Sequence, residues 1–319
     1  MSTLVGPAPI PRVSVGLPVY NGENFLDEAI RSVLGQTMDS IELIISDNAS
    51  TDHTEEICRT WSARDERVRY VRNPANRGAT ANYNAVATLA RGEYFKWMAH
   101  DDTIAPPFLE RCVKMLDARP DVVLAYTTVR DIDFAGESIA VRSTGLRADS
   151  DDPVERFRQL IRLHYLCEAV FGVMRRETLI ATGLLDTYAD CDRVLLAQLG
   201  LAGRFVEIDE PFLLHRQHGE RSVVRYPSRQ KRGAWFSPSA GGRPGFPYTR
   251  EWIGFAAAIR GARMAPGQRW RCGCALVRWG ITNRDGLWED IDFAVRYLLR
   301  PWKRRITGRP VHGETNHER

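Results

Sequence analysis

The 319-residue sequence lacks several features, and each absence excludes a class of protein. No apolar run reaches the roughly 18 residues needed to span a bilayer. Residues 1–11 are short and proline-rich, without the cationic start and apolar stretch of a signal peptide. We therefore expect a protein that acts in the cytoplasm and has no membrane-spanning helix.

The six cysteines show neither a disulfide nor a zinc-binding rhythm. The closest two, Cys272 and Cys274, are too near each other for a zinc-binding pair and have no matching second pair. Also missing are the glycine-rich dinucleotide loop, the Gly-x-x-x-x-Gly-Lys-Ser/Thr loop, the Gly-x-Ser-x-Gly elbow and the His-Glu-x-x-His helix. These absences argue against dehydrogenases, nucleotide hydrolases, esterases and zinc proteases. Residues 18–23 also lack the glycine-rich basic loop of a nucleotidyltransferase.

Acidic residues are scarce in the last third of the chain. Residues 216–319 carry 21 basic and 8 acidic side chains, so of the total net charge of +4 about −9 belongs to the preceding residues. A basic segment suits nucleic acid, anionic lipid headgroups or a diphosphate-bearing substrate. Interleaved apolar residues favour peripheral contact with the inner face of a membrane over nucleic-acid binding, so we expect no nucleic-acid partner. A nucleic-acid-binding module in this segment is the alternative. These residues are Trp270, Leu276, Trp279, Trp288, Leu298 and Trp302.

Short apolar runs alternate with helical periodicity through most of the chain. Such alternation predicts an α/β fold with a mainly parallel sheet flanked by helices. Strands are expected at 13–17, 41–45, 68–71, 93–98, 122–128, 170–174, 205–208 and 212–215. Helices are expected at 23–34, 52–61, 79–90, 107–118, 153–163, 192–202, 252–264, 268–278 and 287–299. Residues 225–250 show no periodicity and predict a long loop or lid.

Polar clusters follow three of the expected strands. They are Tyr20-Asn21, Asp47-Asn48 and His100-Asp101-Asp102. Ligands of parallel α/β sheets bind at the carboxyl ends of the strands, where these clusters would converge. Asp101 and Asp102 suit a hard divalent cation that also contacts substrate phosphates. Alternatively, Asp102 simply caps the helix that follows.

Four ordered motifs resemble family 2 glycosyltransferases of the GT-A fold. They are Pro18-Val-Tyr-Asn21 with Glu23, residues 44–52, Asn76-Arg-Gly78 with Asn82 and Asn84, and His100-Asp-Asp102. The likeness runs from about residue 12 to residue 222. It implies a Rossmann-like GT-A domain at 10–222, followed by a basic, helical C-terminal extension at 223–319 that contacts acceptor or membrane.

The resemblance also implies roles for individual residues. Asp102 matches the ligand of Mn²⁺ or Mg²⁺, although the usual first Asp of that motif is replaced by Ala99 or His100. His218 and Arg216 match the segment that approaches the diphosphate, with Arg221 nearby. The donor nucleotide would be bound by Pro18, Tyr20, Asn21, Glu23, Asp47, Arg77 and Asp101.

The catalytic base of the family opens a helix on the acceptor side. Asp192 matches it, with Cys191 where a Glu is usual, and Asp190 is the alternative; either could instead be a plain N-cap. The implied reaction is inverting transfer of a sugar from a nucleotide diphosphate donor to a hydroxyl of a glycan or lipid-linked acceptor, in cell-envelope glycan or glycolipid synthesis. A non-catalytic nucleotide-sugar binding protein of the same fold is the alternative, because Cys191 and the shortened Asp motif both depart from the family pattern.

Overall fold

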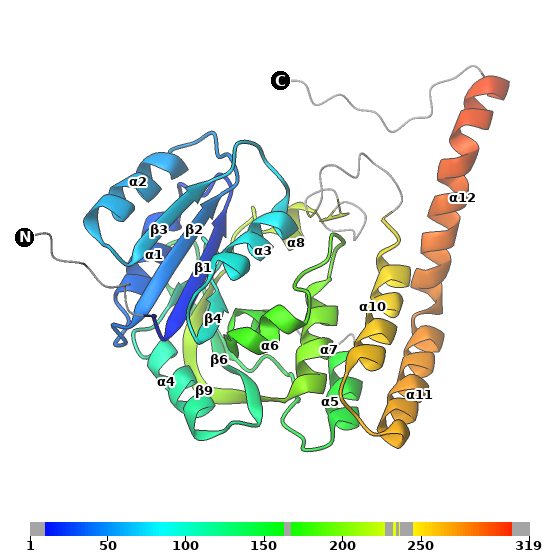
Figure 1. The fold of residues 1–319 in the computed structure, drawn as a ribbon. Helices are drawn as coiled ribbons and strands as arrows, with labels where there is room; N and C mark the ends of the chain where they lie inside the picture. Colours follow the sequence, from blue (N-terminus) through cyan, green and yellow to red (C-terminus); the bar gives the residue numbers. More distant parts are fainter. Residues whose placement is uncertain (1–9, 163–166, 227–231, 234–235, 237–244, 308–319) are drawn as a thin grey trace, which may run out of the picture.

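One curved sheet of nine strands forms the centre of the protein (Figure 1). The computed structural model describes residues 10–162, 167–226, 232–233, 236 and 245–307. The strand order is β3-β2-β1-β4-β8-β6-β9-β5, with β7 paired to β6. The strands are β1 Val13–Val19, β2 Ile41–Asp47, β3 Val68–Arg72, β4 Tyr94–Trp97, β5 Thr103–Ile104, β6 Val122–Ile132, β7 Ser138–Arg142, β8 Val173–Arg175 and β9 Arg204–Arg216.

The predicted mainly parallel sheet is confirmed. Strands β1, β2, β3 and β4 pair in parallel, as do β6 and β9. The short β8 pairs antiparallel with both β4 and β6, so these two neighbours run in the same direction. Only β5, β7 and β8 run against the other strands of the described sheet. The carboxyl ends of β1, β2 and β4 therefore meet at one edge.

Alternate residues of the strands build a separate core on each face of the sheet. On one face, Val15 of β1 and Ile45 of β2 pack with α1 Leu26–Leu34, α2 Thr54–Arg64 and α4 Phe108–Ala118. On the other face, Phe95 and Trp97 of β4 pack with α3 Ala79–Leu89. A strand buried on both faces needs the near-continuous apolar runs seen in β1 and β2.

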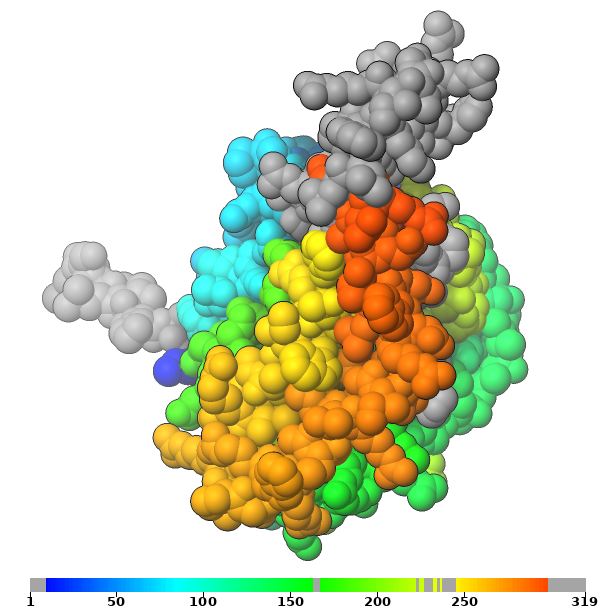
Figure 2. Space-filling model, turned by 90° about the vertical axis from the view of Figure 1, so that its right-hand side faces the viewer, coloured from blue at the N-terminus to red at the C-terminus, as the bar shows by residue number. Residues whose placement is uncertain are grey.

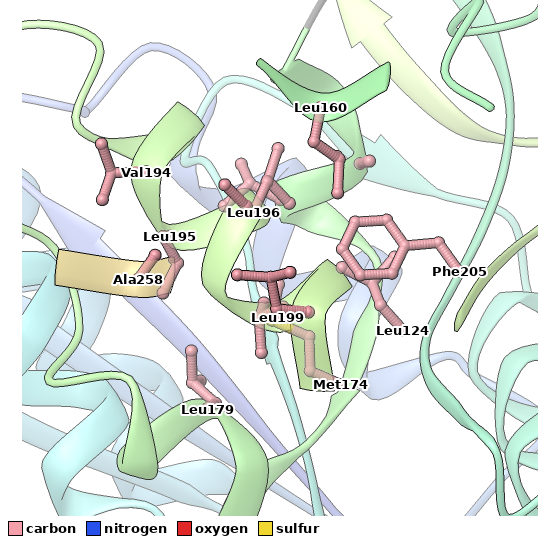
Figure 3. Packing of buried hydrophobic residues seen from close by; sticks show 14 of the residues in the cluster. Leu124, Leu160, Met174, Leu179, Val194, Leu195, Leu196, Leu199, Phe205 and Ala258 are labelled. Carbon is pink, nitrogen blue, oxygen red and sulfur yellow. The ribbon is translucent and has the colours of Figure 1, made fainter. Parts of the chain in front are cut away.

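Helix α7 (Asp192–Ala202) lies in the second core and is almost entirely buried. Figure 3 shows Leu195, Leu196 and Leu199 of α7 among side chains from strands and helices that are distant in sequence, including Leu124, Phe205 and Ala258. The neighbouring elements are α5 Pro153–Leu160, the 3-10 helix η1 Cys167–Phe171 and α6 Arg176–Ala181. This packing fixes the direction in which the first residue of α7 points.

Two of the C-terminal helices, α10 Pro247–Gly261 and α11 Pro266–Thr282, share the second core with α7. The other two are α8 Ser222–Arg225 and α12 Arg284–Thr307. The ring of Phe255 on α10 lies edge-on to Phe157 of α5 and to Trp279 of α11, at centroid distances of 6.1 and 5.6 Å. Helices α10 and α11 are thus part of the same apolar core as the predicted 10–222 domain. The division at residue 222 stays a prediction.

Some expected elements differ from the structure. The run 170–174 begins in η1, and only residues 173–175 form β8. The two strands expected at 205–208 and 212–215 are one strand, β9, whose pairing with β6 shifts register near Val129. Much of the loop expected at 225–250 lies outside the described residues, and α10 begins before its expected end. Within the described part of the chain, no helix is long and apolar enough to cross a membrane.

Candidate active site

The loop after β1 is fixed to the loop after β2. Asn21 adopts a positive φ of 51° and accepts a hydrogen bond from the Thr51 amide at 2.9 Å. Its own amide donates to the Ser50 hydroxyl at 2.9 Å. The glycine at position 22 lies so close to His100 that a Cβ there would be 2.6 Å from the imidazole ring. The loops after β1, β2 and β4 therefore converge, as the sequence predicts.

Asp47 is fully buried at the end of β2 and is held from three sides. Its carboxylate accepts hydrogen bonds from the Tyr70 hydroxyl at 2.9 Å and the Ser50 amide at 2.8 Å, and pairs with the Arg72 guanidinium at 3.2 Å. Tyr20, one position beyond β1, leaves 43% of its surface exposed. This edge combines a fixed carboxylate with an open aromatic ring, two groups that can bind a nucleobase.

The other predicted nucleotide-binding residues of this region differ in what they contact. Pro18 is buried within β1. Glu23 accepts hydrogen bonds from the His53 amide at 2.9 Å and pairs with its ring at 2.8 Å, which lowers the pKa of the Glu23 carboxyl. Arg77 is exposed, and its amide donates to the Asn48 side chain at 2.9 Å. Glu23 thus braces the start of α2, whereas the Arg77 guanidinium lies at the surface.

Each of the paired aspartates after β4 is matched to a histidine from the end of β9. The Asp101 carboxylate lies 3.0 Å from Nε2 of His218. The Asp102 carboxylate lies 3.1 Å from Nδ1 of His215 and accepts a hydrogen bond from the Arg216 amide at 3.0 Å. Asp102 is 3% exposed. The strand pairing of β5 with β9 brings these groups together from positions more than 100 residues apart.

Electrostatics shift the pKa of two members of this cluster. Burial acts to raise the pKa of Asp101, but His100 and His218 outweigh it and the pKa falls well below its ordinary value. Burial acts to lower the pKa of His215, but the hydrogen bond and charge of Asp102 raise it overall. These shifts favour the anionic form of Asp101 and the cationic form of His215.

Arg216 and Arg221 occupy different environments. Arg216 is 1% exposed, and its guanidinium donates to the carbonyl oxygens of Asp101 and Phe134 and pairs with Glu28 at 2.5 Å. Arg221 is half-buried, with its guanidinium 3.3 Å from Nε2 of His215. The predicted Arg216 is thus occupied by protein acceptors, whereas Arg221 lies beside the aspartate–histidine cluster.

A divalent cation is compatible with these side chains when the substrate supplies further ligands. Among the described residues, no group of three or more His, Cys, Asp or Glu side chains is arranged to hold a metal alone. Asp101 and Asp102 do offer carboxylate oxygens, the ligands that Mg²⁺ and Mn²⁺ prefer. A cation here would need oxygens from a diphosphate to complete its coordination.

Asp192 opens α7 and is a carboxylate of unusual basicity. Burial, and then the charge of Asp190, raise its pKa to about 6, although Arg193 and a hydrogen bond with Cys167 act to lower it. Its Oδ1 accepts a hydrogen bond from the Arg193 amide at 3.0 Å. Burial also raises the pKa of the Cys191 thiol, so this residue does not supply the negative charge of a Glu at the same position. A carboxylate with a pKa near 6 is suited to general-base chemistry at neutral pH.

Asp190 is held differently. It has a positive φ of 67°, and its carboxylate lies 3.3 Å from the Arg232 guanidinium. Tyr83 of α3 is half-buried, and desolvation of its hydroxyl raises its pKa. The negative charges of Asp101, Asp102 and Asp192 raise this pKa further.

A cleft of about 550 Å³ lies beside the start of α7, between α10 and the segment that follows α6. Tyr188 and Cys191 line it, and Arg250 of α10 pairs with Asp186 at 2.6 Å on its wall. Asn84 of α3 holds the segment in place through two hydrogen bonds to the Leu185 backbone, at 2.8 and 3.1 Å.

Comparison with known proteins identifies the family. The profile described as glycosyl transferase family 2 matches residues 14–179, just over half of the chain. The chain belongs to glycosyl transferase family 2. It is similar to an uncharacterized glycosyltransferase of Haemophilus influenzae, with 32% identity over 140 residues that make up 44% of this chain and 56% of that protein. It is also similar to a chondroitin synthase of Pasteurella multocida, with 33% identity over 41% of this chain and 14% of that one. The chain thus spans little more than half of the first relative and a small part of the second.

Two solved glycosyltransferases show the same fold. Residues 1–349 of S. aureus TarS in complex with UDP-GlcNAc match with a TM-score of 0.63 and 15% identity, covering 85% of this chain and 73% of that one. The mannosyltransferase PcManGT of Pyrobaculum calidifontis, in complex with GDP-Man and Mn²⁺, matches with a TM-score of 0.57 and 20% identity, covering 89% and 74%. This family 2 glycosyltransferase therefore has the GT-A fold, as its motifs predict.

Sequence reasoning on the family motifs missed three residues of the site. His215 is not assigned a role by the motifs, and its signal is a second histidine three positions before His218. Cys167 and Tyr83 carry no motif signal, because their positions depend on where η1 and α3 pack in the fold.

Proposed function

We propose that this glycosyltransferase moves a sugar, with inversion at its anomeric carbon, from a nucleotide diphosphate donor to a hydroxyl of a cell-envelope glycan or glycolipid. The observation that carries the proposal is the convergence of the loops after β1, β2 and β4 on the Asp101–Asp102 pair in a chain of glycosyl transferase family 2. Asp192, whose pKa is raised to about 6, opens α7 and is the candidate base. A base on the opposite side of the site from the leaving group is what single displacement requires.

In this proposal the nucleoside binds at the carboxyl ends of β1 and β2. The open ring of Tyr20 packs on the base, and Asp47, held by Tyr70 and Ser50, accepts a hydrogen bond from its edge. Asn21 and Glu23 fix the surrounding loops, Pro18 fixes the end of β1, and the exposed Arg77 approaches the nucleotide. UDP-GlcNAc and GDP-Man are bound by the two structural neighbours, so both nucleosides are donor candidates.

The diphosphate would lie by Asp101 and Asp102. Mn²⁺ or Mg²⁺ bound by Asp102 would supply positive charge to the leaving diphosphate. His218 and Arg221 lie at this cluster and can donate hydrogen bonds to phosphate oxygens. Arg216 is assigned a different role from the one its sequence suggests, because its buried guanidinium joins the backbone after β4, the turn after β6 and helix α1 instead of facing an open site.

The acceptor would bind at the start of α7, next to the cleft that Tyr188, Cys191 and Arg250 line. Its hydroxyl gives its proton to Asp192 as the oxygen bonds to the anomeric carbon and the bond to the diphosphate breaks. Asp190 keeps the basicity of Asp192 high through its charge, and Arg250 offers a hydrogen-bond donor on the cleft wall. We propose that the acceptor is a glycan or lipid-linked hydroxyl.

Calorimetric titration with UDP, dTDP and GDP, each with Mn²⁺ and with EDTA, tests the donor site in the wild-type protein and in Asp102→Asn. Binding of one nucleotide that needs the metal and is lost in the variant supports the proposal. Donor binding without any sugar transfer to hydroxyl acceptors, or to water, would favour the non-catalytic binding protein. No binding of any diphosphate contradicts both.

A further inference from the structure

Helices α11 and α12 bury one face against the rest of the protein. The glycine at position 286 lies so close to Tyr248 of α10 that a Cβ there would be 2.4 Å from the ring. The Asp290 carboxylate accepts a hydrogen bond from the Thr249 amide at 2.7 Å. The buried residues recur at steps of three and four, which places them on one side of the two successive helices. They are Cys272, Leu276, Trp279, Asn283, Gly286 and Asp290.

The opposite side of the same helices is apolar and exposed. Its members also recur at steps of three, four and seven, so they form one stripe half a turn away from the buried face. We call this set the outer stripe: Trp270 (74% exposed), Val277 (59%), Ile281 (63%), Trp288 (66%), Ile291 (48%) and Val295 (47%). Figure 2 shows α10, α11 and α12 side by side on one face of the molecule.

Isolated exposed apolar residues are ordinary in soluble proteins, but six on one side of two successive helices, interrupted by the exposed Arg284, form a patch. The fold needs no second apolar face here, because the inner face already joins the helices to α10 and the core. The exposed apolar side chains of the outer stripe would be removed from water by an apolar partner. Two of the six are tryptophans, which are enriched at membrane–water interfaces.

Charge indicates what that partner is. The last turns of α12 follow the outer stripe along the chain and contain Arg300, Lys303, Arg304 and Arg305, with no acidic residue from 298 to 307. A second copy of the chain would present the same basic segment and the same sign of charge. An anionic lipid surface offers apolar depth to the stripe and negative headgroups to the basic turns.

We propose that α11 and α12 lie on the surface of an anionic phospholipid membrane, with the outer stripe at the boundary of headgroups and acyl chains. Because α10 packs against both α12 and α7, this would orient the start of α7, with Asp192, relative to the membrane. The proposal rests on surface residues outside the sugar-transfer site, so it stands or fails independently of the proposed function.

Vesicle flotation with the full chain tests it. The wild-type protein should bind phosphatidylcholine vesicles that contain phosphatidylglycerol, and bind pure phosphatidylcholine vesicles at least tenfold more weakly. Ile281→Asp and Trp288→Asp should each weaken binding to the anionic vesicles about tenfold, because a charge replaces an apolar group at the boundary. Val141→Asp is the matched control: Val141 on β7 is 55% exposed and lies outside the stripe, and its substitution should leave binding unchanged.

Two results would overturn the proposal. One is equal binding of all three variants and the wild-type protein to anionic vesicles, or no vesicle binding at all. The other is a wild-type dimer, seen by sedimentation equilibrium, that Ile281→Asp converts to a monomer without any vesicle binding; this would assign the stripe to a second copy. Circular dichroism melting checks that each variant is folded, and nucleotide binding by the same variants reports on the sugar-transfer site separately.

Discussion

The two halves of the site are held together over very different sequence distances. In the donor half, Asn21 reaches Thr51 and Glu23 reaches His53, each across 30 positions. In the acceptor half, Arg193 reaches Glu251 across 58 positions, and Asn84 reaches Leu185 across 101. The nucleoside end of the donor half is therefore built from neighbouring βα units. The acceptor half, like the pairs Asp101–His218 and Asp102–His215, depends on tertiary packing of elements far apart in the chain.

This difference sets how much of the protein can be predicted from its sequence. The donor half is predictable, because each loop directly follows an apolar strand and its polar residues sit at fixed offsets, as in Tyr20-Asn21 and Asp47-Asn48. The helix that starts at Asp192 is predictable as well. The pairing of His215 with Asp102 and the contact of Cys167 with Asp192 are not, because each depends on which distant elements pack together. Glu251 lies just before the helix expected at 252–264, and nothing in the sequence indicates that the fold buries it.

The largest expected effect is on turnover. If Asp192 is the base, Asp192→Asn should lower kcat by about 10²- to 10⁴-fold, the range typical for loss of general acid–base catalysis. Nucleotide binding should be unchanged, because the donor half is built from other residues. The measurement is steady-state sugar transfer alongside calorimetric UDP and GDP binding. A variant that keeps full turnover would remove Asp192 from the mechanism.

The buried ion pair between α7 and α10 should show how strongly the acceptor half depends on distant packing. Arg193 Nε lies 3.0 Å from Glu251, and the two side chains are 7% and 1% exposed. Glu251→Gln should lower the free energy of unfolding by about 3 kcal/mol, because it leaves a buried guanidinium without its charge partner. Urea denaturation measures the loss.

Asp152→Asn is the matched control for that experiment. Arg271 pairs with Asp152 at 2.9 Å, but the two side chains are 48% and 35% exposed. The amide side chain of this variant would keep an oxygen that can accept the hydrogen bond which the Val154 amide donates to Asp152 at 3.0 Å. The expected loss is under about 0.5 kcal/mol. Equal losses in the two variants would contradict the special dependence of α7 on α10.

The ionised Asp192 carboxylate should also lower the free energy of unfolding at neutral pH. Its folded pKa of about 6 lies above the ordinary carboxyl value, so protonation favours the folded state. This gain in the free energy of unfolding is complete below the pKa of about 4 in the unfolded chain, and it is lost as the pH rises through about 6. Asp192→Asn should therefore raise the free energy of unfolding at pH 7.5 by about 2 kcal/mol. Urea melts at pH 7.5 and pH 4 check this, because the gain should be smaller at the lower pH.

The smallest expected effect is a shift in the pH profile. After burial, the charge of Asp190 raises the pKa of Asp192, so Asp190→Asn should move the acid limb of kcat to lower pH, by about one unit or less. Activity at pH 7.5, where Asp192 is ionised in both proteins, should change far less than in Asp192→Asn. A tenfold or larger loss at every pH would instead make Asp190 the base.

The burial of Arg216 has a consequence for how mutants of this protein should be interpreted. Its guanidinium holds the backbone after β4, the turn after β6 and Glu28 of α1 in one place. An inactive Arg216→Ala protein would imitate the loss of a phosphate-binding side chain while in fact reporting the displacement of these three segments. Arg221, half-buried beside His215, is the position at which removing a positive charge tests phosphate binding without dismantling the frame around it.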